Sequence, residues 1–295
     1  MNTVTVVDTI SREDFYRNFV KKNKPLLIKN QTREWAAREL WTTDYFKNEK
    51  WNLEMIAKKG DVSKGNREQV KLADYIDNLI AYEKEKAKGT GKQLEKPAYL
   101  HDVPIFNLLP DLTKDIEPFP LELFPKWYWK NYQNYIQFFM GSSDSVTPLH
   151  FDTLCTHNMF FQMVGAKKFI LIEAKQKDLC YLQRWRWSKI DASNVDYSEF
   201  PNAEKLNIQE VIVKGGDILY MPSGMLHQVH SLSFSISFNI DWHTAKSAAS
   251  GILSKFKGAP WKNMYYNCLI FIGVALKIPS KYIFPYYKSY LNYVS

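Results

Sequence analysis

Cysteine is scarce in this chain. Only 3 of the 295 residues are cysteines, and Cys155, Cys180 and Cys268 lie far apart, with no Cys-x-x-Cys pair. This excludes a disulfide-stapled fold and gives no zinc-binding pattern. Isolated cysteines in an odd number are typical of a reducing compartment, so we expect a cytoplasmic protein.

Long apolar runs are also missing. The N-terminus has neither a basic segment nor a long apolar one, so no signal peptide is expected. The most apolar run, Cys268 to Ile278, is too short to span a bilayer, and no membrane partner is expected. The absence of a Gly-x-Ser-x-Gly sequence argues against serine-hydrolase chemistry. No RNA-binding module or zinc finger is visible either.

Aromatic residues and positive charge are plentiful. The chain is 45% hydrophobic and 15% aromatic, which is enough to bury a substantial core. Its formal net charge is +8, and its pI is about 9.1. This balance fits either a lysine-rich solvated surface or an acidic partner, such as nucleic acid or an acidic peptide.

The chain divides into three parts by pattern. Residues 1–134 mix helices and strands, with a helix expected at Ser11–Val20, a strand at Pro25–Lys29 and a helix at Val70–Tyr82. Residues 135–243 are predicted to form the catalytic core. Residues 244–295 turn helical and aromatic, and we expect them either to pack on the core or to form a homodimer contact, which we favour.

The central part reads as a run of short strands. Eight such strands fit a double-stranded β-helix, or jelly roll, so the fold class is mostly β with flanking helices. The candidates are Tyr135–Met140, Thr147–Thr153, Asn158–Val164, Lys167–Ile172, Glu210–Val213, Asp217–Met221, His227–Ser231 and Ser233–Trp242. In the last of them, serine, asparagine and aspartate alternate with large apolar residues. The polar face either lines the barrel lumen or meets solvent, and alternation alone leaves both open.

Two histidines and an aspartate carry the strongest chemical signal. His150 and Asp152 are two residues apart, so on a strand they point to the same face. His227, from a distant strand, can complete the two-histidine, one-carboxylate set that holds non-haem Fe(II) and leaves positions open for dioxygen and a cosubstrate. The remaining histidines that could compete are expected to be structural or to face the substrate, with His157 in a loop; they are His101, His157, His230 and His243.

Such an iron site needs a reductant, and 2-oxoglutarate supplies it. Its distal carboxylate requires a buried cation and hydroxyl donors. Lys167 is the candidate cation, with Lys168 as a competitor that spacing alone does not remove. Thr147 and Tyr99 can donate hydroxyl hydrogen bonds to the same group.

These motifs together resemble the Jumonji C, or cupin-8, hydroxylases, among them the asparaginyl hydroxylases. The resemblance rests on Thr147-Pro-Leu-His-Phe-Asp, Asn158 to Lys167, Gly216-Asp-Ile-Leu-Tyr-Met-Pro before His227, and Phe238-Asn239. It implies that His150, Asp152 and His227 hold iron. It implies that Lys167, Thr147 and Tyr99 bind 2-oxoglutarate, with Asn158 and Asn239 around the cosubstrate. Two extra residues between Asp152 and Asn158, and Asp241 in place of an aromatic residue, depart from the family pattern near the substrate.

The resulting prediction is a 2-oxoglutarate-dependent dioxygenase that uses Fe(II) and O2 to hydroxylate a protein, peptide or peptide-like substrate. The alternatives are the same chemistry on tRNA or on N-methyl-lysine, and an inactive cupin that acts as a binding protein. The charged segment 58–96 and the loop after Asp152 are predicted to frame the substrate entrance. The family resemblance also implies a homodimer formed through the C-terminal helices.

Overall fold

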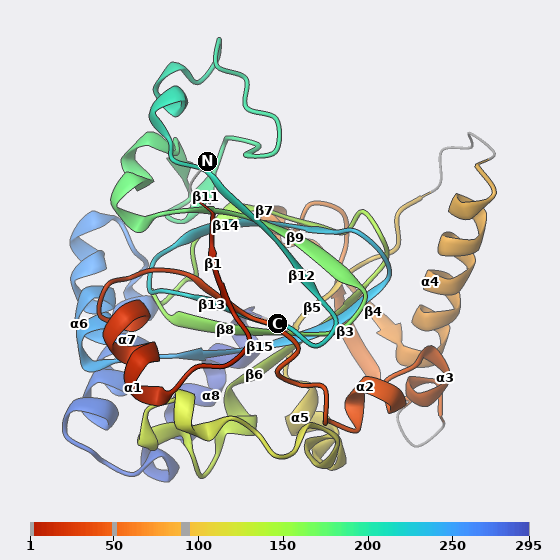
Figure 1. Ribbon diagram of the computed structural model, residues 1–295, viewed down its shortest axis with the longest axis horizontal. Coiled ribbons are helices and arrows are strands. Elements are labelled where there is room, and N and C mark those ends of the chain that lie inside the picture. Colours follow the sequence, from red (N-terminus) through yellow and green to blue (C-terminus); the bar gives the residue numbers. More distant parts are fainter. Residues whose placement is uncertain (1–2, 49–51, 90–94, 295) are drawn as a thin grey trace.

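Two facing sheets form the centre of the molecule in the computed structural model, which describes residues 3–48, 52–89 and 95–294 (Figure 1). The larger sheet has the strand order β1-β2-β13-β8-β15-β6-β5. Its strands are β1 (Thr5–Val7), β2 (Leu26–Ile28), β13 (Ile218–Met221), β8 (His157–Val164), β15 (Ser235–Trp242), β6 (Ile136–Gly141) and β5 (Leu100–Val103). The smaller sheet has the order β10-β11-β7-β14-β9-β12. Its strands are β10 (Leu182–Gln183), β11 (Trp187–Ser188), β7 (Val146–His150), β14 (Leu226–Ser231), β9 (Ala166–Ile172) and β12 (Gln209–Lys214).

Apolar side chains from both sheets meet between them. Phe160 and Leu219 of the larger sheet share one buried cluster with Phe169, Leu171 and Val229 of the smaller sheet. Nearly all pairings are antiparallel, and β1–β2 is parallel. This arrangement is the predicted jelly roll, and all eight predicted strands are present within a few residues of their expected limits.

The polar face of β15 points inward. Ser235, Ser237, Asn239 and Asp241 are all buried, and Ser237 Oγ accepts a hydrogen bond from Lys167 Nζ on β9 across the barrel. The solvent-facing alternative for this strand is therefore wrong. On its other face, Phe238 stacks with Phe161 and lies in a large aromatic core outside the barrel.

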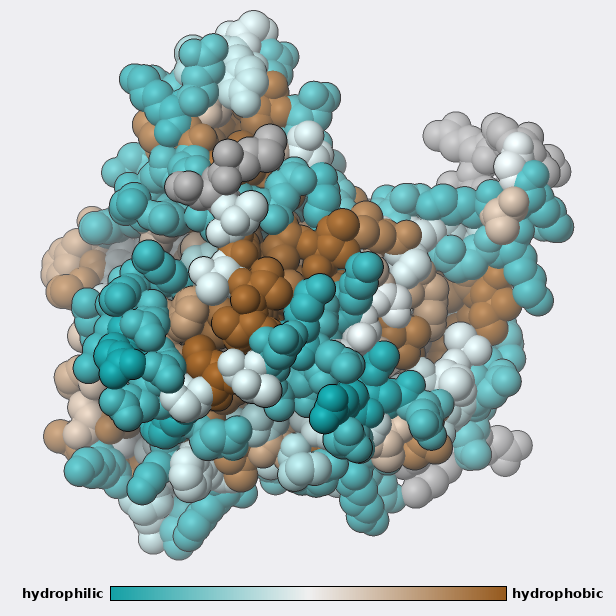
Figure 2. Space-filling view, viewed as in Figure 1, coloured by the Kyte–Doolittle hydropathy of each residue, from teal (hydrophilic) through white to brown (hydrophobic). Residues whose placement is uncertain are grey.

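The N-terminal part supplies that outer layer. It contains α1 (Arg12–Phe15), continued by η1 (Tyr16–Val20), then α2 (Ala37–Leu40), α3 (Thr43–Phe46), α4 (Leu72–Ala87) and α5 (Ile105–Leu108). A separate hairpin pairs β3 (Glu54–Lys58) with β4 (Arg67–Lys71). The predicted loop Lys88–Lys92 lies largely outside the described residues, and its role at the substrate entrance stays a prediction. On the face seen in Figure 2, apolar side chains gather over the middle of the barrel, where β1 and β12 lie.

A glycine sets the register of the strand that carries the two candidate lysines. Gly165 joins β8 to β9 with φ +76°, a conformation that L side chains rarely adopt. A Cβ there would lie 2.1 Å from the Phe234 carbonyl oxygen. The tight turn fixes the start of β9, and side chains then alternate along it. As a result Lys167 points into the barrel and is 1% exposed, whereas Lys168 points outward and pairs with Glu210.

Three helices follow the barrel, as predicted for the tail. They are α6 (Ala245–Leu253), α7 (Trp261–Ala275) and α8 (Ser280–Val294). Thr244 and Ser247 form a reciprocal capping box at the start of α6. The tail packs on the core, because Trp127 Nε1 donates to the Ile278 carbonyl and Tyr135 packs its ring against Phe284. It also leaves large apolar side chains in solvent, among them Leu253, Phe256, Trp261 and Leu276. No helix among the described residues is long and apolar enough to cross a membrane.

Candidate metal centre

The three predicted iron ligands come together at one end of the barrel. His150 on β7 and His227 on β14 are direct neighbours in the strand register. The strand was expected to run through Asp152 but ends at His150, so Asp152 reaches the site from the following loop. Asp152 Oδ1 lies 4.0 Å from His150 Nε2 and 3.8 Å from His227 Nε2. One ligand atom from each of these residues lies within 4.8 Å of the others, so a single ion can contact all three.

Hydrogen bonds to the backbone aim both imidazoles at this point. His150 Nδ1 is 2.8 Å from the Pro148 carbonyl oxygen, and His227 Nδ1 is 3.2 Å from the Met225 carbonyl oxygen. A carbonyl only accepts, so each Nδ1 carries the proton. Each Nε2 is then left with a free lone pair facing Asp152.

Burial keeps His150 uncharged. Desolvation lowers its pKa well below the usual histidine range, and the nearby His227 lowers it further. The Trp187 ring stacks on the His150 ring with centroids 4.7 Å apart and holds its plane. A neutral, oriented imidazole is the form that binds a metal ion.

Lys167 lies deeper in the same cavity. Its Nζ donates to Tyr99 Oη at 2.9 Å and to Ser237 Oγ at 2.8 Å. Among the described residues no carboxylate pairs with it, and burial lowers its pKa to about 7. A buried ammonium with only neutral partners lacks a counter-ion, so the cavity is suited to bind an anion.

Thr147 and Tyr99 both line this cavity. Thr147 also belongs to a buried hydrogen-bond network that the sequence analysis did not predict. Thr147 Oγ1 is 3.2 Å from His101 Nε2. His101 Nδ1 lies 2.8 Å from Asp102 Oδ2, which also accepts from the buried Lys58. His101 Nδ1 also lies 3.1 Å from Lys58 Nζ, so Lys58, Asp102, His101 and Thr147 form one connected set of buried hydrogen-bonding groups. The network therefore fixes the position of the Thr147 hydroxyl.

An amide pair links Asp152 to a second buried carboxyl group. Asn158 Nδ2 is 3.3 Å from Asp152 Oδ2 and 3.0 Å from Asp241 Oδ1, and Asn239 Nδ2 is 3.3 Å from the same Asp241 oxygen. Burial raises the pKa of Asp241 well above its usual range, with a further contribution from Asp152. The Oδ1 atoms of Asn158 and Asn239 are buried without a partner among the described residues. Unsatisfied acceptors facing a cavity are a sign that a ligand or water belongs there.

The other histidines stay out of the ligand set. His157 was predicted to lie in a loop, and this is wrong: it begins β8, pairs in register with Trp242 and stacks on its ring. The strand extends further because β15 continues to Trp242 and offers it a partner. His230 and His243 do not reach the cavity, which has a volume of about 60 Å³ and is lined by all eight predicted site residues.

Comparison with known proteins decides the family. Residues 12–248 match the model of the cupin-like domain. The chain belongs to this family. It is 27% identical over 250 residues to the lysine-specific demethylase JMJ30 of Arabidopsis thaliana, which covers 82% of the chain and 55% of that protein. It is 26% identical to the 2-oxoglutarate and iron-dependent oxygenase JMJD4 of Gallus gallus, over 80% of the chain and 59% of that protein.

The relatives differ in the substrates that their names give. The tRNA wybutosine-synthesizing protein 5 of Gallus gallus is 22% identical over 81% of the chain and 76% of its own length. The chain spans somewhat over half the length of most of the curated relatives named here. Fe(II), 2-oxoglutarate and O2 are the cofactors of this family. The donor set fits them, because two imidazoles and a carboxylate face one point, and deeper in the same cavity lies the Lys167 ammonium, which no carboxylate of the described residues pairs with.

Proposed function

We propose that this protein is an Fe(II)- and 2-oxoglutarate-dependent oxygenase that hydroxylates a protein, peptide or peptide-like substrate. One observation carries the proposal: the His150, Asp152 and His227 cluster shares a buried cavity with an ammonium group, Lys167, that has no counter-ion among the described residues. A metal site alone would not need such a cation. The 2-oxoglutarate molecule needs both, since it binds metal at one end and carries a carboxylate at the other.

Each residue of the cavity has a role in this proposal. O2 is the oxidant, and 2-oxoglutarate bound with Fe(II) would supply two of the electrons that reduce it: C–H, O2 and 2-oxoglutarate give C–OH, succinate and CO2. His150, Asp152 and His227 hold the metal, and Asn158 orients the Asp152 carboxylate through its amide. Lys167 and Tyr99 position the distal carboxylate of 2-oxoglutarate, with Thr147 beside them. Asn239 offers a polar side chain on the same wall.

Succinate formation tests the proposal directly. The purified chain with Fe(II), ascorbate and 2-oxoglutarate is expected to release succinate slowly without a substrate, and faster when the correct substrate is added. The matched control is Asp152→Asn, which keeps the size of the side chain and removes its charge. Absence of succinate under all conditions, with the metal bound, would favour the inactive binding protein.

Two other substrate classes keep the same cavity chemistry. N-methyl-lysine demethylation is supported by the lysine-specific demethylase among the relatives, and tRNA by the wybutosine-synthesizing protein. Mass spectrometry separates them after reaction with a cell lysate. A gain of 16 Da on peptides supports hydroxylation, loss of 14 Da on lysine supports demethylation, and a mass change confined to tRNA supports the third class.

A further inference from the structure

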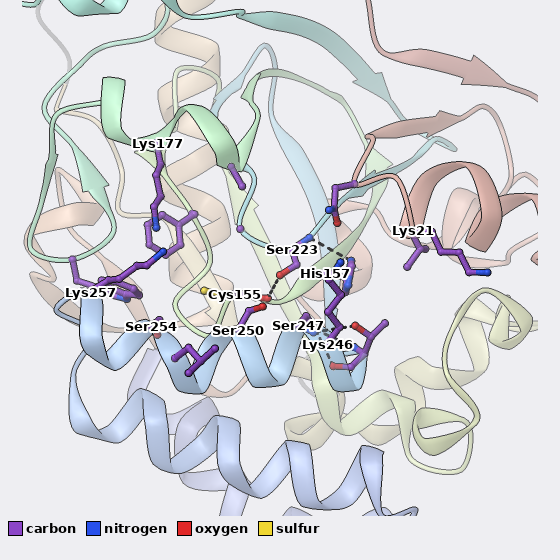
Figure 3. Close-up of a pocket in the computed structure, with 18 of the residues that line it drawn as sticks. Lys21, Cys155, His157, Lys177, Ser223, Lys246, Ser247, Ser250, Ser254 and Lys257 are labelled. Atoms are coloured by element: carbon purple, nitrogen blue, oxygen red, sulfur yellow. Dashed lines mark hydrogen bonds between the residues drawn. The ribbon is translucent and has the colours of Figure 1, made fainter.

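A second, much larger cavity lies beside the loop that carries Asp152. Its volume is about 770 Å³ (Figure 3). One wall is α6 with its preceding Thr244, and another is the loop of residues 151–157. The end of η1, the turn at Ser223 and Gly224, and η8 (Ala174–Leu179) complete it. None of the predicted site residues lines this cavity.

The charges around this cavity have one sign. Four lysines line it, Lys21, Lys177, Lys246 and Lys257, and no aspartate or glutamate does. Among the described residues, none of the four forms an ion pair. Some surface lysines elsewhere are paired, such as Lys47 with Asp77, Lys86 with Asp144 and Lys168 with Glu210, and none of these lines the cavity. The walls of the cavity therefore carry positive charge with no carboxylate of the described residues paired to it.

The lysines are spread along the cavity and do not meet at one point. In Figure 3, Lys177 and Lys257 lie on one side of it and Lys21 on the other, with Lys246 on α6. They come from three separate segments of the chain, with Lys246 and Lys257 near the two ends of one continuous helical segment. A single small anion cannot contact all of them, whereas an extended chain with repeated negative charges can.

Apolar side chains form much of the floor of the cavity, and aromatic rings in its lining already have partners: Arg12 lies over the Tyr16 ring, and the buried His157 stacks on Trp242. Val20, Phe151, Leu253 and Trp185 contribute to the lining. Phe151 is 3% exposed, and its ring meets the Trp185 ring edge to face. Single-stranded RNA is held mainly by exposed rings on which its bases stack, and by arginine, which does not line this cavity. An apolar floor with a lysine rim fits a peptide that carries both acidic and apolar side chains.

The cavity adjoins the metal centre through the loop of residues 151–157, which hydrogen bonds hold in place. Phe151 and His157, on either side of Asp152 in sequence, both line it, and so does Cys155. This loop contains the two residues by which the chain departs from the family pattern. Ser223 Oγ donates to the Cys155 carbonyl, and Asn263 Nδ2 donates to the Thr153 carbonyl at 3.1 Å. A peptide seated in the cavity would thus lie against the segment that carries a metal ligand.

We infer that this cavity binds an acidic segment of a polypeptide substrate, with its carboxylates paired to Lys21, Lys177, Lys246 and Lys257. The identification of the occupant as substrate rests on the proposed function. Binding itself does not, because it can be measured on the metal-free chain.

Fluorescence anisotropy with a defined probe tests the inference. The probe is a fluorescein-labelled peptide of repeated Glu-Glu-Leu units, and the comparison peptide has glutamine in place of glutamate. Changing all four lysines to glutamate is expected to weaken probe binding by about 10-fold or more, since four exposed charge pairs are lost. The matched control changes Lys64, Lys84, Lys130 and Lys214 to glutamate, four exposed lysines that do not line the cavity. It alters net charge equally and is expected to change binding less than about 2-fold.

Each outcome bears on the inference. The inference is supported if probe binding is lost in the cavity variant alone and the glutamine peptide does not bind. If the lysine-to-glutamate variant fails to fold, a variant with the same four lysines changed to glutamine takes its place. Equal loss in both variants overturns it, because binding would then follow net charge. Tighter binding of an oligo(U) RNA that depends on the same four lysines also overturns it, in favour of nucleic acid. Lysine-dependent peptide binding without any succinate formation would leave the cavity a peptide site and reject the proposed function alone.

Discussion

Replacing Lys167 with alanine should separate binding of 2-oxoglutarate from the integrity of the fold. The wild-type ammonium has two neutral hydrogen-bond partners and, among the described residues, no counter-ion, so a bound carboxylate becomes its charged partner. A hydrogen bond to a charged group contributes about 1.5–3 kcal/mol. At about 1.4 kcal/mol per factor of ten, the 2-oxoglutarate concentration needed for half-maximal turnover should rise by roughly 10 to 100-fold.

The measurement is succinate release against 2-oxoglutarate concentration, with Lys168→Ala as the control. Lys168 is the next residue on β9, points outward and pairs with Glu210, so its loss should leave the requirement unchanged. Thermal unfolding of the ligand-free Lys167 variant should show equal or higher stability, because the fold no longer buries an uncompensated charge. If the 2-oxoglutarate requirement rose with Lys168→Ala and did not rise with Lys167→Ala, the assignment of Lys167 as the partner of the distal carboxylate would be refuted.

Lys167 should also make the binding of 2-oxoglutarate depend on pH. Burial lowers the pKa of Lys167 to about 7 in the ligand-free protein, from a usual value of 10.5. A bound carboxylate favours the charged ammonium, so binding takes up a proton at pH values above about 7. The dissociation constant of 2-oxoglutarate should therefore rise with pH above 7, by up to about 10-fold per unit. Calorimetric titration checks this, and a pH-independent constant for the wild type would contradict it.

Three further predictions concern the metal, the turn and the tail. Asp152→Ala should abolish turnover and lower metal content while preserving the far-ultraviolet circular dichroism spectrum; full activity would reject the ligand assignment. Gly165→Ala should destabilise the fold by at least about 1–3 kcal/mol in denaturant titration, because of its positive φ and the contact with Phe234. The exposed apolar side chains of the tail predict a dimer in light scattering at micromolar concentration, and a 34.6 kDa species would reject it.

Short-range patterns in the sequence were enough to predict the strands of the barrel and to bring together the three candidate metal ligands. Strand alternation has a period of two, and β15 shows it over its whole length, so the strands could be located before their partners were known. The spacing of His150 and Asp152 confined both to one site even though the strand ends between them. His227 was found because the motif around it is also local.

Only the tertiary structure decided which groups face one another. The choice between Lys167 and Lys168 depended on the register set at Gly165, and a shift of one residue would have exchanged them. The burial of Asp241, and its link to Asp152 through Asn158, required β8 and β15 to pair.

The lysine-lined cavity was the feature least predictable from the sequence. Its four lysines are spread along the sequence between positions 21 and 257. A net charge of +8 does not show where on the surface the positive charges lie close together. Side-chain periodicity records which face of its own element a residue occupies. The distance between residues that are remote in the chain is set by packing. Packing therefore decided that, in the described part of the chain, no carboxylate pairs with Lys167 or with the lysines of the larger cavity.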